Sequence, residues 1–241
     1  MYNIAISLAL CVLTTIVLRA LVGLNLWLST ILSLVVFTVC YLILTRMVMK
    51  KVAALMESAQ RDLQAGRAEK AIKTLESGYR YGNWQFYVKA QINAQIGTLL
   101  FLRRDFAKAF DYLQKGFVRH WVAMAMLGIC YMKRNQTTKM VETFDKAVAA
   151  NKKEPLLWNL YAYCLERVGD KEKAIQVMEK GLKKVGGDEN LSANLQALKD
   201  GRRMKMRLYG DLWYQFHLEK PGAVVKEQTK AVMGRRKIVR R

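Results

Sequence analysis

Two long runs of apolar residues open the chain. The residues from Tyr2 to Leu18 and from Leu26 to Leu44 include no Asp, Glu, Lys or Arg. As helices, these runs would extend roughly 26 and 28 Å, enough to cross the hydrocarbon core of a bilayer. The short stretch between them makes the turn. The pattern predicts a transmembrane helical hairpin in residues 1–51, with spans at about 2–18 and 26–44.

The alternative for the first run is a cleaved signal peptide. Such a peptide has a basic region before its apolar run and small residues at a cleavage site after it. Neither feature accompanies the first run, so the sequence favours a retained span.

Basic residues gather directly after the second run. Arg46, Lys50, Lys51 and Arg61 follow it, whereas the turn holds only Arg19. Lys and Arg are enriched in the cytoplasmic flanks of membrane spans. We therefore expect a protein integral to the plasma (inner) membrane, with both termini and the rest of the chain in the cytoplasm.

The pattern then changes to amphipathic helices arranged in pairs. Between Pro155 and Lys184, apolar residues recur at helical spacing, Gly169-Asp170 interrupts them, and a second helical stripe follows. The first stripe consists of Leu157, Trp158, Tyr161, Ala162 and Leu165, and the second of Ala174, Val177, Met178 and Gly181. This arrangement predicts a helical hairpin of about thirty residues.

The same arrangement recurs along the chain. Thirty-four residues upstream, Leu127-Gly128, Tyr131, Phe144 and Ala147 occupy equivalent positions. Earlier copies centre on Gly97 and, more weakly, on Gly66. Because one short hairpin cannot bury its own apolar face, such copies stack into a solenoid, which we expect over residues 52–200.

These residues resemble the tetratricopeptide repeat, whose consensus has Trp, Leu-Gly and Tyr on its first helix and Ala, Phe, Ala and Pro on its second. The resemblance covers roughly residues 53–200. It implies a non-enzymatic scaffold whose first helices line a groove for a protein or peptide partner. The groove positions implied in this chain are Thr98, Phe101, Ile129, Met132, Lys133, Asn159, Tyr163, Glu166 and Arg167. Two spans followed by such repeats look like the arrangement of membrane-anchored bacterial repeat proteins.

The last part of the chain is expected to close the solenoid. Residues 188–199 have the pattern of one more first helix, and residues 201–222 contain apolar and aromatic residues typical of one long capping helix. Open solenoids require such caps. The predicted fold is therefore all-α: a two-helix transmembrane hairpin, a solenoid of about four hairpins and a C-terminal capping helix.

Positive charge accumulates at the C-terminus. The chain has a formal net charge of +21, and residues 202–241 hold 12 of its 40 basic residues against three of its 19 acidic ones. A run of this kind is typical of a solvated, disordered tail, here residues 223–241. Anionic lipid headgroups and nucleic acid are its two candidate ligands. The residues concerned are Lys226, Lys230, Arg235, Arg236, Lys237, Arg240 and Arg241.

An aromatic-rich insert at residues 79–87 separates the first two repeats. Aromatic side chains among basic ones can stack nucleobases. We favour the simpler interpretation that they fill a gap left by irregular repeat spacing.

Candidate catalytic groups are scarce. His120 and His217 are isolated, the four cysteines form no C-x-x-C pair, and no phosphate-binding glycine loop occurs. The sequence therefore predicts no enzymatic activity, metal or cofactor. The main hypothesis is a membrane-anchored scaffold, and the alternative is a tether that binds nucleic acid or anionic lipid through its tail.

Overall fold

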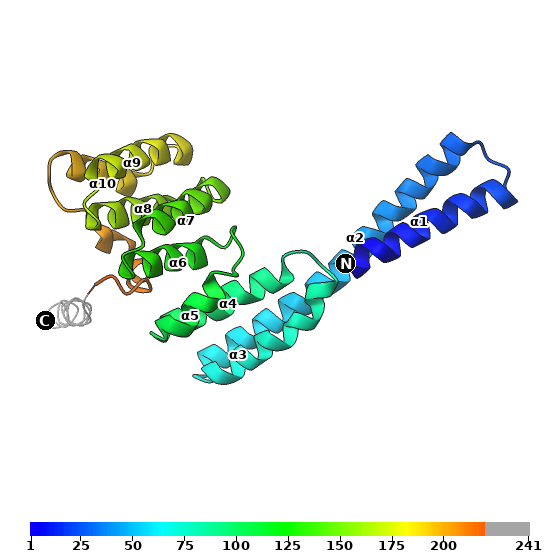
Figure 1. Ribbon diagram of the computed structural model, residues 1–241, viewed down its shortest axis with the longest axis horizontal. Helices are drawn as coiled ribbons and strands as arrows, with labels where there is room; N and C mark the ends of the chain where they lie inside the picture. Colours follow the sequence, from blue (N-terminus) through cyan, green and yellow to red (C-terminus); the bar gives the residue numbers. More distant parts are fainter. Residues whose placement is uncertain (220–241) are drawn as a thin grey trace, which may run out of the picture. The chain divides into compact units, whose positions relative to one another are not determined.

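The computed structural model describes residues 1–219, and every regular element in that part of the chain is helical (Figure 1). The chain divides into two compact units. The first unit comprises Met1–Leu99 and Asp111–Phe117, and the second comprises Leu100–Phe110 and the chain from Val118 onward.

The first unit begins with the predicted helical hairpin. Helices α1 (Tyr2–Leu21) and α2 (Leu26–Gln64) pack side by side along the apolar stretch (Figure 1). Small polar side chains lie between them: Ser29 and Ser33 are buried, and the Thr15 hydroxyl donates a 2.8 Å hydrogen bond to Ser33 Oγ. Such residues allow two helix backbones to approach closely and satisfy their own polar groups across the interface.

Helix α2 continues without a break into the first repeat. Its 39 residues include neither glycine nor proline, so no residue interrupts the helix where the apolar run ends. The last turns of α2 pack against α3 (Ala68–Ser77). There the buried carboxylate of Asp62 pairs with Arg67 at 2.9 Å and with Lys70 at 3.3 Å. The expected boundary at residue 51 therefore lies inside one helix.

The rest of the first unit contains a short 3-10 helix and parts of two further α-helices. Helix η1 (Gly78–Asn83) follows α3 and leads to α4 (Val88–Leu102), which is paired with α5 (Phe106–Leu113). Gly97 of α4 lies directly against Leu113 of α5, where a Cβ atom would have no room. The division between the two units passes through this helix pair.

The second unit contains the most regular repeats. Helices α6 (Trp121–Lys133) and α7 (Thr137–Ala150) form one hairpin, and α8 (Pro155–Arg167) and α9 (Lys171–Val185) form the next. Helix α10 (Glu189–Lys199) follows as a further first helix. Helices α6, α8 and α10 begin 34 residues apart, which confirms the period seen in the sequence.

The turns of the four repeat hairpins between α2 and α9 share one backbone geometry. Each contains a residue with positive φ: Gly66 at 75°, Arg104 at 66°, Asn135 at 56° and Gly169 at 92°. In each turn the residue after it donates its N–H to the carbonyl five positions earlier, as Asp170 does to Leu165. This is the hydrogen bond that closes a Schellman-type helix end. The four turns therefore mark equivalent points of four repeats.

The long capping helix expected over residues 201–222 does not form in the described part of that range. Residues 206–209 make a 3-10 helix, η2 (Met206–Tyr209), and residues 211–214 make a single helical turn, α11 (Asp211–Tyr214). Gly201 and Gly210 interrupt the helical pattern, because both have positive φ, 74° and 53°. The chain consequently turns back on itself after α10.

Candidate partner-binding groove

Residues 203–219, here called the C-terminal segment, run along the first helices of the second unit. A chain of polar contacts fixes the beginning of this segment. The backbone N–H of Lys205 donates a 2.7 Å hydrogen bond to the Asn194 side chain on α10, and Asn194 donates one of 2.9 Å to Asn159 on α8. Asn159 in turn donates one of 2.7 Å to the hydroxyl of Tyr209. These buried amides therefore have partners supplied by the segment itself.

Aromatic contacts fix the rest of the C-terminal segment. Trp213 is buried and packs edge to face on Tyr163 of α8, with ring centroids 4.9 Å apart. Phe216 is fully buried and lies 6.4 Å from Trp121 at the start of α6. The segment thus crosses α10, α8 and α6 in reverse order along the chain.

His217 makes the last of the described contacts between the C-terminal segment and the first helices. Its ring stacks on Phe101 at 5.8 Å, and its Nε2 lies 3.2 Å from the carbonyl oxygen of Leu102 at the end of α4. Burial lowers the pKa of His217, the hydrogen bond to Leu102 opposes that shift, and the positive charges of Arg104 and Lys133 reinforce it. The surroundings therefore disfavour protonation of the imidazole.

Several residues predicted to line an open groove are covered. Phe101, Ile129 and Asn159 are fully buried. Met132 is half-buried, whereas Lys133 is exposed, with its ammonium over the ring of Phe106 at 4.4 Å. Thr98 belongs to the first unit, where its hydroxyl donates to the carbonyl of Ala94. Phe101 and Asn159 lie on first helices, as the sequence indicated, but the C-terminal segment covers both of them.

The remaining predicted residues line an open pocket beside α8. Tyr163, Glu166 and Arg167 form one wall, and the C-terminal segment forms the other. The cavity has a volume of about 1050 Å³. The lining residues that the sequence analysis did not assign to the groove are Arg203, Met204, Lys205, Met206, Arg207, Leu208, Trp213, Leu218 and Glu219. We call this cavity the α8 pocket.

The α8 pocket combines positive charge with exposed apolar surface. Arg167 donates two hydrogen bonds to the Tyr163 hydroxyl, at 2.8 and 3.1 Å. Glu219 accepts from both Arg207 and the indole of Trp213. Among the described lining residues are four cations, Arg167, Arg203, Lys205 and Arg207, and two carboxylates, of which Glu219 is paired with Arg207. Leu208, 57% exposed, adds an apolar contact site at the rim.

Within the described residues, His120 and the cysteines of the second unit lie at packing and capping positions. Within residues 1–219 no group of three His, Cys, Asp or Glu side chains is placed to hold a metal ion. His120 caps α6 by accepting a 3.2 Å hydrogen bond from the N–H of Ala123. Cys130 and Cys164 are buried thiols, and burial raises the pKa of Cys130 to about 11. These groups serve packing and helix capping.

The comparison with protein families identifies the repeat. A family model described as tetratricopeptide repeat matches residues 156–183, which lie within the hairpin of α8 and α9. Residues 156–183 are therefore a tetratricopeptide repeat. Searches among curated proteins and among solved structures gave no match. A tetratricopeptide repeat indicates a protein-interaction scaffold, because stacked repeats expose extended binding surfaces.

The predicted ligand-binding residues of the basic tail, Lys226, Lys230, Arg235, Arg236, Lys237, Arg240 and Arg241, lie outside the described residues.

Proposed function

We propose that this tetratricopeptide repeat protein is a membrane-anchored scaffold that binds a cytoplasmic protein through the α8 pocket. The observation that carries the proposal is the pocket itself. It is open, it lies on the first helix of the repeat that the family model matches, and it joins exposed apolar surface to an excess of positive charge. The ligand of such a site is a peptide segment with acidic and apolar side chains.

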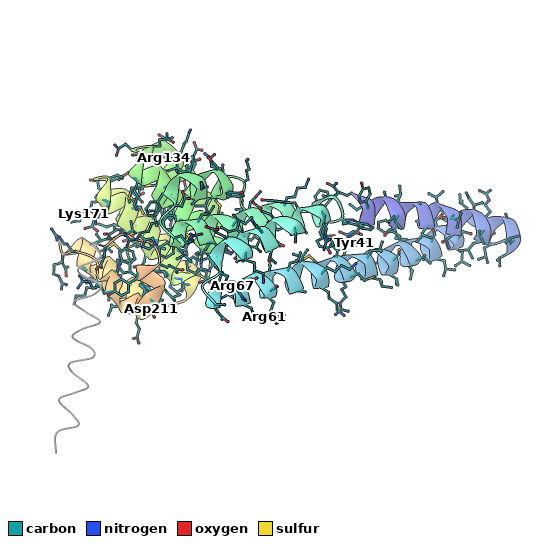
Figure 2. All side chains as sticks on the ribbon, turned by 90° about the horizontal axis from the view of Figure 1, so that it is seen from below. Tyr41, Arg61, Arg67, Arg134, Lys171 and Asp211 are labelled. Atoms are coloured by element: carbon teal, nitrogen blue, oxygen red, sulfur yellow. The ribbon has the colours of Figure 1, made fainter. Side chains whose placement is uncertain are left out.

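Helices α1 and α2 support the anchoring part of the proposal. Both are long and apolar enough to span a bilayer. Their apolar side chains project outward from the hairpin, as Figure 2 shows, and Leu13, Ile16 and Leu34 are each 60% exposed. A helix from a soluble core would bury these side chains, whereas a membrane span presents them to lipid.

The charges after the second span favour one orientation. Arg46, Lys50 and Lys51 lie on α2 just beyond its apolar part. This positive flank supports an orientation with the repeats on the cytoplasmic side of the plasma (inner) membrane.

The C-terminal segment covers the face of the first helices in the second unit, which makes that face a less favourable binding site than the α8 pocket. Because Trp213, Phe216 and His217 already occupy the face formed by α8, α6 and the end of α4, a partner would have to displace buried aromatic side chains to bind there. The α8 pocket requires no such displacement. A partner segment can contact Tyr163, Arg203 and Leu208 in the structure as it stands.

Site-specific photocrosslinking in cells tests the proposal. Leu208→p-benzoylphenylalanine places the crosslinker at the rim of the pocket. We expect a discrete crosslinked product that weakens roughly tenfold when Arg203→Glu and Lys205→Glu remove the complementary charge. Lys183→Glu with Lys184→Glu, an identical change of charge on exposed positions of α9, is the matched control and should leave the product unchanged. Equal loss in both double variants would show that the pocket is not the binding site.

A further inference from the structure

The loop between η1 and α4 is fastened to both helices of the N-terminal hairpin at one level. Trp84 packs edge to face on Tyr2, in the first turn of α1, with ring centroids 5.3 Å apart. The side-chain oxygen of Gln85 accepts hydrogen bonds from Asn3 on α1 at 3.0 Å and from Thr45 on α2 at 3.3 Å. The loop therefore lies where α1 begins and where the apolar part of α2 ends (Figure 1).

The two residues that follow in this loop expose aromatic rings. Phe86 is 51% exposed and Tyr87 is 63% exposed. Tyr87 has a positive φ of 67°, and its ring lies 5.1 Å from that of Phe117. A bulky residue adopts this backbone conformation only where its surroundings hold it. The rings are thus held in an exposed position by named contacts instead of being folded into the core.

We propose that these residues form an aromatic collar that sits in the headgroup region of the bilayer. The collar comprises Tyr2, Trp84, Phe86, Tyr87 and Phe117. The inference rests on the proposed membrane anchor and adds a second attachment outside the two apolar runs, made mainly by the loop of residues 84–87.

Three observations favour a lipid surface as the partner of the collar. The collar is continuous with the exposed apolar surface of the hairpin, because Tyr2 is 50% exposed and belongs to both. Trp and Tyr side chains concentrate at membrane interfaces, because each ring has an apolar part that enters lipid and a polar group that stays hydrated. Thr45 is followed on α2 by Arg46, Lys50 and Lys51, whose charges suit anionic headgroups at the same level.

The contacts of Gln85 explain how the collar would act on the first unit. One amide oxygen joins the cytoplasmic ends of both spans to the loop that leads into α4. If the rings enter the interface, α3, η1 and the start of α4 are held at a fixed depth, in addition to the connection through α2. The role of the aromatic insert is then attachment to the membrane interface, in place of gap filling or base stacking.

A depth measurement on the full chain in vesicles tests the inference. Phe86→Cys is made in a background in which Cys11, Cys40, Cys130 and Cys164 are replaced by alanine. The variant is labelled with an environment-sensitive fluorophore and reconstituted in phosphatidylcholine with phosphatidylglycerol. Leu13→Cys in α1 reports on the anchor. Gln64→Cys is the reference for a label that is fully exposed to water. Gln64 is exposed and lies 19 residues beyond Thr45 on α2, about 28 Å away.

We expect the label at position 86 to be quenched by lipids that carry a nitroxide near the headgroup. We also expect its quenching by aqueous iodide to be several-fold weaker than at position 64. A label at position 86 that behaves like the one at 64, while the label at 13 is within the hydrocarbon, overturns the collar and leaves the anchor intact. A label at position 13 that iodide quenches freely overturns the anchor and the collar together. Circular dichroism of each variant verifies that the helices remain folded.

Discussion

The side-chain amide of Asn159 on α8 donates a 2.7 Å hydrogen bond to the hydroxyl of Tyr209, fifty residues further along the chain. Asn159 is fully buried, and its oxygen accepts a second hydrogen bond from Asn194 of α10. Burial and the nearby Asp188 carboxylate raise the pKa of Tyr209, so that its hydroxyl keeps its proton. These hydrogen bonds join α8, α10 and the C-terminal segment in one buried polar network.

Substitution of Asn159 should destabilise the second unit. Asn159→Ala removes the acceptor of the buried Asn194 amide and one hydrogen bond of the Tyr209 hydroxyl, which costs about 2 kcal/mol in the free energy of unfolding. Tyr209→Phe removes only the hydroxyl and should cost about 1 kcal/mol. Urea unfolding of the detergent-solubilised chain, followed by circular dichroism, measures both values. A loss below about 0.5 kcal/mol for Asn159→Ala would show that the network contributes little.

Trp213 should hold the C-terminal segment against α8. Trp213→Ala removes a buried indole that packs on Tyr163 and donates to Glu219, and we expect a cost of about 3–5 kcal/mol. Trypsin should then cleave faster after Arg203 and Arg207, because the released segment can enter the protease.

The neighbouring residue provides a matched control for this experiment. Leu212 is 56% exposed, so Leu212→Ala should change stability by less than about 0.5 kcal/mol and leave the cleavage rate unaltered. Equal cleavage rates in the two variants would contradict a holding role for Trp213.

The turn between α4 and α5 can be stabilised. Arg104 occupies the left-handed position that glycine fills in two equivalent turns, at Gly66 and Gly169. Arg104→Gly relieves the steric cost of a Cβ atom in this conformation and should raise the free energy of unfolding by about 0.5–1 kcal/mol. Arg103→Gly removes the same charge from the adjacent residue, where φ is not positive, and should not stabilise. Thermal unfolding distinguishes the two, and a rise in Tm in both variants would assign the effect to charge.

Acid should weaken the second unit through its two histidines. Burial lowers the pKa of both His120 and His217 below the ordinary value of about 6.5. Below that pH the unfolded chain binds protons more readily than the folded chain, so stability is full above about pH 6.5 and falls as the pH drops towards the folded pKa values. Tm measured from pH 7.5 to 5.5 should therefore decrease.

A double variant tests the assignment of that decrease. His120→Asn keeps an acceptor at the start of α6, and His217→Phe keeps a ring on Phe101, while neither new side chain titrates in this range. The decrease in Tm should become smaller than in the parent chain. An unchanged decrease would assign the pH dependence to carboxylates.

The sequence by itself determined the parts of this protein that depend on local pattern. Uncharged runs defined the helices of the hairpin, and the 34-residue period identified the repeats. Each of these features depends on side chains only a few positions apart or on a recurring motif, so it can be read from the order of the residues.

Only the tertiary structure decided which of those residues remain available to a partner. Asn159 and Phe101 carry the pattern of groove residues, yet Tyr209 and His217 cover them. Gly201 and Gly210, both with positive φ, redirect the chain after α10. Trp213, Phe216 and His217 then contact aromatic residues that lie 50 to 116 positions earlier in the chain. Contacts over such separations depend on where the chain turns in space, and helical periodicity contains no information about that.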